Sequence, residues 1–549
     1  MKDFSKEIRA YALKNAVEFG KCEVGRILPK LFQHGLDKAD IKKIIPVVNS
    51  IVKEVNSLKA GEREKEFEKY KGLVKENEHI EREGLPEIEI GDKKNVVTRL
   101  APEPSKYLHL GHAISFLLNY LYAKKNNGKC LIRFEDTNPD KVSQEYVDMA
   151  LDDIRNYLEI KDGGVKYISD DMELLYEYAD KLIKIGKAYI CFCEREKMQD
   201  LRHKGIECEC RKKAKESNMK EWKEFIKGKY AKGEAVLRIK GDMKSQNHVM
   251  RDSVIFRMSD SVHYRHGKKY KVWPTYDFYS IEDSLMGVTL ILRSNEFDLR
   301  VELQEYIKDL LGLKKQTVVQ YGRFNVADFT TKGREIRELI DSGEISGWDD
   351  PRLITLRALK RRGITKEAIY QLTNEVGLSK HQVNLDFDMI AAINRKIIDK
   401  TAERYSFVEA PVELKIGKMP KIKEVEVLVH PDRKETRKIK IGRIFISEKD
   451  YDNLKGGEIR LIHLFNVQLG DKTEFTSTEN KNIQKINWVS EGVKAKILME
   501  NGKWIFGLAE SAVKKLKVGE EIQFERFGFV RFDCYNKKED AYEFWFSHK

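Results

Sequence analysis

The spacing of hydrophobic residues changes along the chain and divides it into regions. The clearest helical pattern near the start consists of Ile41, Ile44, Ile45, Val48, Ile51, Val52 and Val55. This spacing predicts a helical domain over residues 1–94, in which Pro46 marks either a helix start or a kink. Residues 326–400 have a similar pattern and are predicted to form a second helical region.

Strand and helix patterns alternate in the part of the chain that follows residue 94. Residues 95–100 and 129–134 predict two short strands. Between them, a proline-containing loop at 101–105 leads into a helix. The apolar face of this helix consists of Phe116, Leu117, Tyr120 and Leu121. This order of strand, loop and helix is typical of a Rossmann-type α/β domain that binds a nucleotide, which we place at residues 95–325.

Residues 401–549 show the alternation that is typical of β-strands. Hydrophobic residues occupy every second position in three short runs, which are Val425–Val427–Val429, Ile439–Ile441 and Ile444–Ile446. Glycines between and after these runs provide turns, as at Gly442, Gly456 and Gly457. The pattern predicts C-terminal β-barrels. The fold class is therefore a multidomain combination of α/β, α and β regions.

Composition limits the kind of protein and its location. The chain has 549 residues and a net charge of +13, so several domains and an anionic partner are expected. Nucleic acid is the first candidate for that partner, although a basic soluble protein would have the same charge. No apolar run approaches the ~20 residues that span a bilayer. Seven cysteines are too few for a disulfide scaffold of this length, which favours a cytoplasmic protein with reduced thiols.

The segment from Pro102 to His112 carries the most informative chemistry. Its sequence is PEPSKYLHLGH, so His109 and His112 flank Gly111 at the start of the predicted helix. Imidazoles can donate hydrogen bonds to phosphate oxygens, glycine permits close approach of a nucleotide, and a helix N-terminus favours negative charge. The arrangement suits attack on the α-phosphate of ATP. Taken alone, however, two histidines at this place are more often simple helix caps.

The longer sequence resembles a known family. TRLAPEPSKYLHLGHA is similar to the first signature of the glutamyl- and glutaminyl-tRNA synthetases, TRFxPEPxGYLHxGHA, with Lys106 in place of the usual glycine. Three further segments resemble this class I family in the same order. They are RFEDTNP at 133–139, WPTYDF at 273–278 and SGWDDPR at 346–352. The resemblance is strong over residues 95–400 and weaker elsewhere, and the C-terminal barrels suggest the archaeal type of glutamyl enzyme.

The resemblance implies roles for individual residues. His109 and His112 would bind ATP phosphates and stabilise the transition state of adenylation, and Pro102 and Gly111 would belong to the same ATP site. Of the residues that would bind the amino acid, Arg99 would contact the substrate, Glu135 would receive its α-ammonium group, and Tyr276 would line its pocket. Without the resemblance, Arg99 and Glu135 would each be read as part of a surface strand with an ordinary ion pair, and Tyr276 as a core aromatic.

The second signature of the family departs from its usual form in this chain. Class I synthetases have a mobile KMSKS-like loop, which this group shortens to a sequence such as LSKR. The corresponding segment here is DFTTKGREIR at 328–337. We expect Lys332 to be the catalytic, ATP-binding lysine and consider Arg334 the alternative, while Gly333 is an unusual neighbour. An ordinary basic loop before a helix would have the same composition.

The choice between glutamate and glutamine depends mainly on Arg293. Glutamyl enzymes of this group have arginine at this place, whereas glutaminyl enzymes have cysteine. A γ-carboxylate requires a guanidinium, which offers a positive charge and a planar fork of donors. A neutral amide would leave that buried charge unpaired. Ser280 also stands where glutaminyl enzymes tend to have histidine. These residues favour glutamate, although Arg293 could instead form a structural salt bridge with Glu296 or Asp298.

Two cysteine pairs point in the same direction. Cys191 and Cys193 form one C-x-C pair, and Cys208 and Cys210 form another. Four thiolates can complete a tetrahedral zinc site, and alternation along a strand would place both thiols of a pair on one face. Glutamyl enzymes often hold zinc with this spacing in the acceptor-binding insertion. The alternative is two pairs of reduced core cysteines.

The resemblance also implies the partners. The inserted domain at about 171–270 would bind the tRNA acceptor end, the helical region at 326–400 its inner corner, and the barrels its anticodon. The expected function is a monomeric glutamate–tRNA ligase that uses ATP, Mg²⁺ and L-glutamate to charge tRNA(Glu), with tRNA(Gln) left open as a second substrate. A glutaminyl-tRNA synthetase, or a synthetase-like protein that binds tRNA without charging it, are the alternatives.

Overall fold

A computed structural model of the chain describes residues 3–31, 34–37, 40–74, 84–91, 95–326 and 330–549. The chain forms two units, Met1–Glu81 and Arg82–Lys549, which are described separately below. The predicted domain end at residue 94 and the expected loop positions Asp328 and Phe329 lie outside the described residues.

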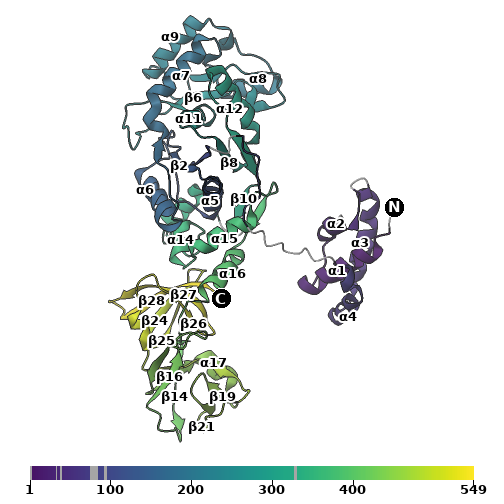
Figure 1. Cartoon of the computed structure of the whole chain (residues 1–549), viewed down its shortest axis with the longest axis vertical. Coiled ribbons are helices and arrows are strands. Elements are labelled where there is room, and N and C mark those ends of the chain that lie inside the picture. Colours follow the sequence, from purple (N-terminus) through teal and green to yellow (C-terminus); the bar gives the residue numbers. More distant parts are fainter. Residues whose placement is uncertain (1–2, 32–33, 38–39, 75–83, 92–94, 327–329) are drawn as a thin grey trace. The chain divides into compact units, whose positions relative to one another are not determined.

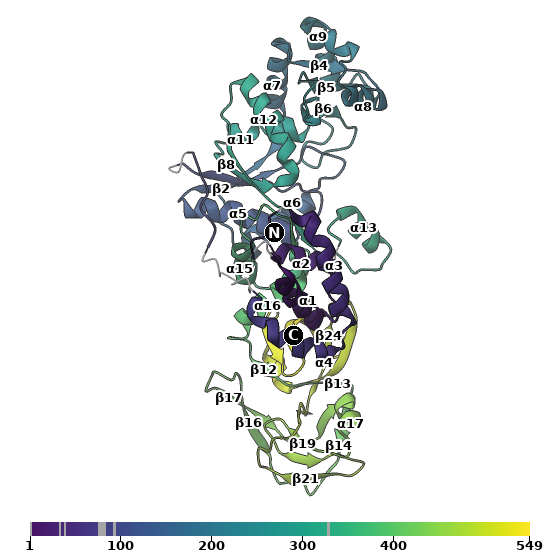
Figure 2. The same ribbon diagram turned by 90° about the vertical axis from the view of Figure 1, so that its right-hand side faces the viewer.

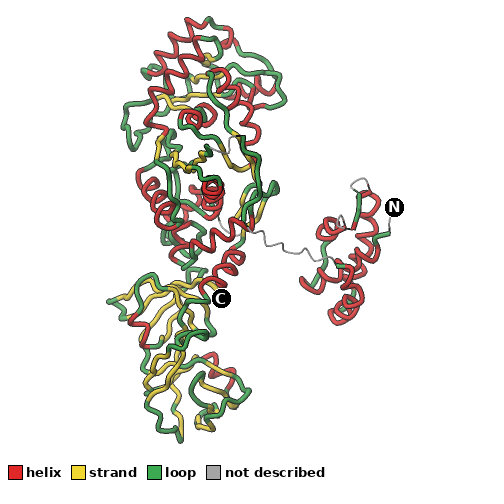
Figure 3. Tube along the Cα trace, viewed as in Figure 1, coloured by secondary structure: helices red, strands yellow, loops and turns green. Residues whose placement is uncertain are grey.

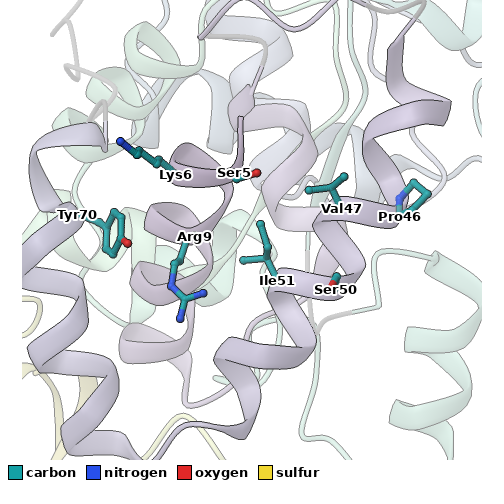
Figure 4. A pocket seen from close by; sticks show the side chains of 8 residues that line it. All are labelled: Ser5, Lys6, Arg9, Pro46, Val47, Ser50, Ile51 and Tyr70. Carbon is teal, nitrogen blue, oxygen red and sulfur yellow. The ribbon is translucent and has the colours of Figure 1, made fainter. Parts of the chain in front are cut away.

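The first unit is built from amphipathic helices. They are α1 (Ser5–Phe19), α2 (Val24–Leu31), α3 (Ile41–Ser57) and α4 (Ala60–Tyr70). The hydrophobic spacing that predicts a helix corresponds to α3, whose Ile44, Val48, Val52 and Val55 enter the core. Pro46 lies inside this helix. A shallow hollow on this unit (Figure 4) is lined by Ser5, Lys6, Arg9, Pro46, Val47, Ser50, Ile51 and Tyr70.

The second unit contains an open parallel sheet. Strands β1 (Val97–Leu100), β2 (Lys129–Phe134) and β3 (Val165–Tyr167) are parallel, as are β8 (Leu290–Ser294) and β9 (Thr317–Tyr321). The Thr289 N–H donates to the Val97 carbonyl at 2.9 Å and places β8 beside β1. Helix α5 (Leu110–Lys125) follows β1, as predicted. In such sheets the ligand site lies beyond the carboxyl ends of the strands.

An antiparallel layer is inserted between β3 and β8. It consists of β4 (Ala188–Cys191), β5 (Val236–Ile239), β6 (Val254–Met258) and β7 (Val272–Pro274). Helices α7 (Met172–Lys184) and α9 (Lys215–Ile226) pack on β4, and both are labelled near the top of Figure 1. Trp222, Phe225 and Phe256 are buried in their shared core.

A helical segment follows the parallel sheet and leads to the C-terminal strands. Its helices are α13 (Gly333–Asp341), α14 (Leu356–Arg361), α15 (Lys366–Val376) and α16 (Phe387–Ile398). Beyond residue 400 the regular structure is strand joined by loops (Figure 3), apart from α17 (Glu448–Leu454) and a 3-10 turn. Among the described residues, no helix combines the length and apolar character needed to cross a bilayer.

The C-terminal strands form a barrel-like arrangement, which confirms the predicted fold class. The largest sheet has seven strands in the order β12-β26-β27-β28-β24-β25-β13. Their bounds are Arg404–Tyr405, Glu521–Phe524, Gly528–Asn536, Ala541–His548, Val493–Leu498, Trp504–Ala509 and Phe407–Glu409. The three alternating runs of the sequence correspond to β16 (Glu424–Leu428), β17 (Thr436–Lys440) and β18 (Ile444–Ser447), in the part labelled β16 and β17 in Figure 2.

Candidate active site

The two signature histidines form the start of α5. The ring Nδ1 of His109 accepts a hydrogen bond from the Gly111 N–H at 3.2 Å, and the His109 N–H donates to Nδ1 of His112 at 3.1 Å. The simple capping role therefore exists in the structure. The two hydrogen bonds also fix the tautomer of each ring, because a neutral imidazole that accepts at Nδ1 has its proton on Nε2. Each ring can then donate an Nε2–H hydrogen bond to an anionic ligand.

The electrostatic surroundings keep both rings neutral. Burial, followed by the positive charge of Lys106, lowers the pKa of His112 to about 3. Burial also lowers the pKa of His109, and His112 and Lys106 lower it further. The ring centroids are 3.8 Å apart, so two imidazolium ions here would repel each other. A phosphate group would meet neutral hydrogen-bond donors beside a helix N-terminus.

Gly111 and the preceding loop set the position of this pair. A Cβ atom at Gly111 would lie 3.1 Å from Cε1 of His109, which is closer than most side-chain contacts. The Leu110 N–H donates to the Ile354 carbonyl at 3.2 Å, so the segment before α14 holds the start of α5. Pro102 is buried, and its carbonyl accepts from the Glu135 N–H at 2.9 Å. The first signature thus contacts the segment that contains Glu135.

Arg99 and Glu135 do not pair with each other. Arg99 donates its Nε–H to Asp283 at 3.1 Å, and Arg133 donates to the same carboxylate oxygen at 2.6 Å. Arg133 also donates to Glu135 at 2.7 Å, and the Tyr279 hydroxyl donates to the other Glu135 oxygen at 3.2 Å. Asp283 is only 2% exposed. Burial alone would raise its pKa, but Arg133 and Arg99 lower it below the ordinary value.

Arg293 lies at the end of β8 and is 6% exposed. Its Nη1 donates to the Tyr276 hydroxyl at 3.1 Å and to Oε1 of Gln304 at 2.9 Å. Within the described residues, its Nε and Nη2 have no hydrogen-bond partner. Neither of the salt-bridge partners that the sequence suggested as an alternative contacts this guanidinium. A buried guanidinium with one edge unpaired is a site for a planar anion such as a carboxylate.

The other edge of Arg293 is fixed by groups from two further helices. Gln304, on α12 (Asp298–Leu311), donates its Nε2–H to Asp277 at 3.3 Å. Arg300 donates to the second oxygen of Asp277 at 2.5 Å. This chain of contacts orients the Gln304 amide so that its oxygen faces Arg293. The orientation of the unpaired guanidinium edge therefore depends on a network that runs from Arg293 through Gln304 to the carboxylate of Asp277.

The expected loop lysine lies at the N-terminus of α13. Lys332 donates to Glu335 at 2.7 Å and its side chain is 77% exposed. Arg334, the alternative, pairs with Glu338 at 2.8 Å and is 87% exposed. Both cations therefore pair with carboxylates of their own helix. The structure does not bring either of them to the histidine pair.

The four predicted cysteines lie together. Their sulfur atoms are all within 4.8 Å of one another, and Sγ of Cys193 is 3.9 Å from Sγ of Cys210. Tetrahedral zinc with ~2.3 Å Zn–S bonds places sulfur atoms roughly 3.8 Å apart, so the donor set fits this metal. Only Cys191 lies in a strand; Cys208 and Cys210 lie at a 3-10 helix, Glu209–Lys212. Strand alternation is therefore not what brings the second pair together.

Comparison with known proteins decides the family. Residues 95–400 match the family described as tRNA synthetases class I (E and Q), catalytic domain. Residues 402–489 and 476–533 match two anticodon-binding domains of the same group. The chain belongs to the class I tRNA synthetases of the E and Q group.

Relatives of this synthetase cover nearly its whole length. A glutamate–tRNA ligase of Pyrococcus abyssi is 39% identical over 95% of this chain and 96% of its own. Those of Korarchaeum cryptofilum and Methanocaldococcus jannaschii are 37% and 36% identical, over 100% and 99% of this chain and 100% of their own. A solved glutamate-tRNA synthetase from Elizabethkingia anophelis is 15% identical, with a TM-score of 0.39 over 56% of this chain and 71% of that chain. The family assignment rests on the sequence matches.

Several residues of this synthetase's site were not predicted. Asp283 and Gln304 have no assigned role in the sequence, although Asp283 is a carboxylate next to another, Glu282, in an otherwise apolar stretch. Arg133 and Asp277 lie in recognised segments but received no role. Their common feature is a buried polar or charged side chain that forms hydrogen bonds with a side chain from another element. Such pairing is a property of the tertiary structure. In the sequence, only the adjacent carboxylates Glu282 and Asp283 indicated that a buried charge was present.

Proposed function

We propose that this synthetase is a glutamate–tRNA ligase. The observation that carries the proposal is the buried guanidinium of Arg293, with Nε and Nη2 unpartnered among the described residues. In the reaction, a carboxylate oxygen of glutamate attacks the α-phosphorus of ATP, and pyrophosphate leaves. A hydroxyl of the terminal tRNA adenosine then attacks the glutamyl carbonyl, and AMP leaves. The archaeal relatives named above have this activity in their names.

The Arg293 guanidinium provides the discrimination between glutamate and glutamine. A γ-carboxylate supplies two acceptors and a negative charge to the unpaired edge. The amide of glutamine would supply one acceptor and place N–H groups against N–H groups. The hydroxyl of Tyr276 is neutral, because burial raises its pKa. Tyr276 therefore adds no charge beside the guanidinium, and the γ-carboxylate of glutamate would pair with its free edge.

The remaining residues divide between ATP and the amino acid. His109 and His112 donate Nε2–H hydrogen bonds to phosphate oxygens, and Gly111 keeps the helix start open for close approach. Arg99 and Glu135 bind the amino acid, with the Glu135 carboxylate accepting from the α-ammonium group. Lys332 contributes to the phosphate site when its loop moves from its pairing with Glu335.

Cofactors and partners follow from the same assignment. ATP with Mg²⁺ is general to class I synthetases, and the fitted cysteine set would hold a structural zinc. The RNA substrate is tRNA(Glu), to which we add tRNA(Gln) as a second substrate. We expect the enzyme to work as a monomer in the cytoplasm.

An Arg293→Gln variant tests the proposal. We expect kcat/KM for glutamate in tRNA(Glu) charging to fall by about 100- to 1,000-fold, because a buried charge pair is lost. The rate with glutamine should change little or rise. Arg155→Gln is the matched control, since Arg155 forms a surface ion pair with Asp162 and should leave both rates unchanged. Labelled glutamate and glutamine, each with tRNA(Glu) and tRNA(Gln), give the four rates.

The same assay separates the alternatives. Charging by glutamine alone would identify a glutaminyl enzyme and contradict the proposal. Binding of tRNA without charging or tRNA-dependent ATP–pyrophosphate exchange, in a folded protein, would indicate a tRNA-binding protein. If kcat/KM fell equally for glutamate and glutamine in Arg293→Gln, Arg293 would not be the residue that selects the amino acid.

A further inference from the structure

Two residues near the ATP site differ from the family's usual pattern, and they lie against each other. Lys106 replaces a glycine in the first signature, and Gly333 follows Lys332 where an arginine is usual. In the structure, a Cβ atom added at Gly333 would lie 3.0 Å from Cβ and 3.4 Å from Cδ of Lys106. The same Cβ would lie 3.4 Å from Nη1 of Arg337, so a side chain at 333 would need the stem of Lys106 to give by a few tenths of an ångström. The φ angle of Gly333 is not in the left-handed region, so the requirement for glycine is one of space.

Lys106 also binds the second-signature loop directly. Its Nζ donates to the Thr331 carbonyl at 3.0 Å. Arg337, on α13, donates in the opposite direction to the Ser105 carbonyl at 3.1 Å. Two reciprocal hydrogen bonds from cations to backbone carbonyls thus join residues 105–106 to residues 331–337. Backbone carbonyls are good partners here because they do not depend on the rotamer of a second long side chain.

The other cations of the loop do not make such contacts. Lys332 and Arg334 pair with Glu335 and Glu338 of their own helix, at 2.7 and 2.8 Å. Those pairs are exposed and contribute little to the position of the loop. Of Lys106, Lys332, Arg334 and Arg337, only Lys106 and Arg337 connect the two signatures.

Lys106 also acts on the histidine pair through its charge. It lies three positions before His109, and its charge contributes to the lowered pKa of both His109 and His112. Burial lowers the pKa of Lys106 itself, and Glu103 partly opposes this effect. The ammonium group thus donates to the loop carbonyl, and its charge acts on both imidazoles.

We propose that Lys106 is a positioning residue that clamps the second-signature loop against the first signature, and that Gly333 is required because Lys106 occupies the space of a side chain. The inference rests on the proposed function in one respect, since the loop acts on ATP only in a synthetase reaction. The clamp itself is a contact within the protein and can be measured without any reaction. Lys106 and Gly333, which both depart from the family pattern, therefore belong together, because the absence of a side chain at 333 makes room for the lysine.

The first experiment removes the donor and keeps the stem. In Lys106→Met, we expect trypsin cleavage after Lys332 and Arg334 to accelerate by about ten- to 150-fold, the range for one lost hydrogen bond to a charged group. The fragments are identified by mass. In tRNA-dependent ATP–pyrophosphate exchange, KM for ATP should rise by a similar factor, while KM for glutamate stays within twofold. Lys106→Arg, which can still donate to the carbonyl, should recover most of both effects.

The second experiment is a double-mutant cycle that tests the space argument. Gly333→Ala in the natural chain should lower kcat/KM for ATP by about tenfold, because the new Cβ displaces the clamp. In a Lys106→Gly background the same Gly333→Ala change should have less than a twofold effect. Gly61→Ala is the matched control, because Gly61 also lies at a helix start and its added Cβ would meet no atom within 4 Å. Equal thermal midpoints across the set show that the variants fold.

The outcomes distinguish this inference from the proposed function. Unchanged cleavage and KM in Lys106→Met, or an equal Gly333→Ala effect in both backgrounds, would overturn the clamp. If the unmutated protein did not charge tRNA, the proposed function would be contradicted. The rate of trypsin cleavage in Lys106→Met would still show whether the clamp exists. If Lys106→Met does not fold, Lys106→Arg and the cycle with Gly333 give the same decision.

Discussion

At the scale of single residues, the site depends on charges that burial has changed. The Nδ1 atoms of His109 and His112 accept backbone or neighbouring N–H groups, so only the neutral rings fit the network. Protonation of either Nδ1 would place a donor against a donor. Burial and the ammonium of Lys106 act in the same direction on the pKa. The histidines are therefore neutral hydrogen-bond donors and not cationic phosphate ligands.

This has a consequence for stability at low pH. The pKa of His112 is about 3 in the folded protein and about 6.5 when unfolded. Below pH 6.5 the unfolded chain binds a proton that the folded chain does not, so this residue's contribution is present above pH 6.5 and is lost as pH falls toward 3. His112→Asn has no titrating ring at this position, so its stability does not fall with pH for this reason. Relative to the natural chain, the variant should gain up to about 2 kcal/mol between pH 6.5 and 5.

Denaturant titrations at several pH values, followed by tryptophan fluorescence, measure the difference in free energy of unfolding. Trp348 is a suitable probe, because its ring stacks on Tyr107 of the first signature at 5.0 Å. The exposed His203 provides the control substitution, His203→Asn. A constant difference between the natural chain and His112→Asn from pH 5 to 7 would contradict this account.

At the scale of elements, short irregular segments bring the functional groups together. The start of α5 is fixed by the segment before α14, and the cysteine pairs come from the end of β4 and from a 3-10 helix. Tyr189 of β4 donates to Asp252 at 2.9 Å and lies 3.5 Å from Sγ of Cys208. Contacts of this kind hold metal ligands in position. The cysteine cluster is thus supported by the sheet of the inserted layer.

The element-scale prediction concerns this cluster. We expect the purified protein to contain about one zinc ion per chain, since four thiolates complete a structural site. Cys210→Ser should abolish stoichiometric zinc and lower the thermal midpoint of the inserted layer. Metal analysis and calorimetry provide the two measurements. Cys22→Ala is the matched control, because Cys22 lies in the helical N-terminal unit. Metal-free protein with an unchanged midpoint in Cys210→Ser would leave the cluster as reduced core cysteines.

At the scale of the second unit, two arginines of α14 and its C-cap join the helical segment to the C-terminal sheet. Arg361 binds both oxygens of Asp533, at 3.0 and 2.8 Å, and also Asp349 at 2.6 Å. Arg362 is fully buried and donates to the carbonyls of Phe546 and Ser547 at 3.3 and 3.0 Å. Burial lowers the pKa of Arg362 to about 10, which leaves it charged at neutral pH. The last strand, β28, is therefore anchored to the region that holds the start of α5.

An Arg362→Met variant tests this anchor. Removal of the donor leaves buried carbonyls unpaired, so the free energy of unfolding should fall by about 2–4 kcal/mol. The C-terminal sheet should then unfold in a separate, earlier calorimetric transition, and KM for tRNA should rise. Arg395→Met, on the exposed face of α16, is the control. A single transition at the natural midpoint would show that the contact does not couple the two regions.

The strands β1 and β2, the helix at α5 and the alternating C-terminal strands could be predicted from the sequence alone, as could the family signatures and the cysteine pairs. These features are local, because hydrophobic period and motif order can be read from neighbouring positions. The sequence also indicated Arg293, since its chemistry matches a γ-carboxylate. It could not show that Arg293 is oriented by Gln304.

Tertiary structure alone decided the pairings between distant segments. Arg99 contacts Asp283 across 184 positions, and Lys106 contacts the Thr331 carbonyl across 225. Which buried charges meet depends on how the parallel sheet brings β1 and β8 together, and a single sequence contains no signal for such a pair. The contacts of the second signature could not be predicted from the sequence for the same reason. The residue type predicted a phosphate-binding Lys332, but only packing showed that Lys106 donates to the Thr331 carbonyl and that Arg337 donates to the Ser105 carbonyl.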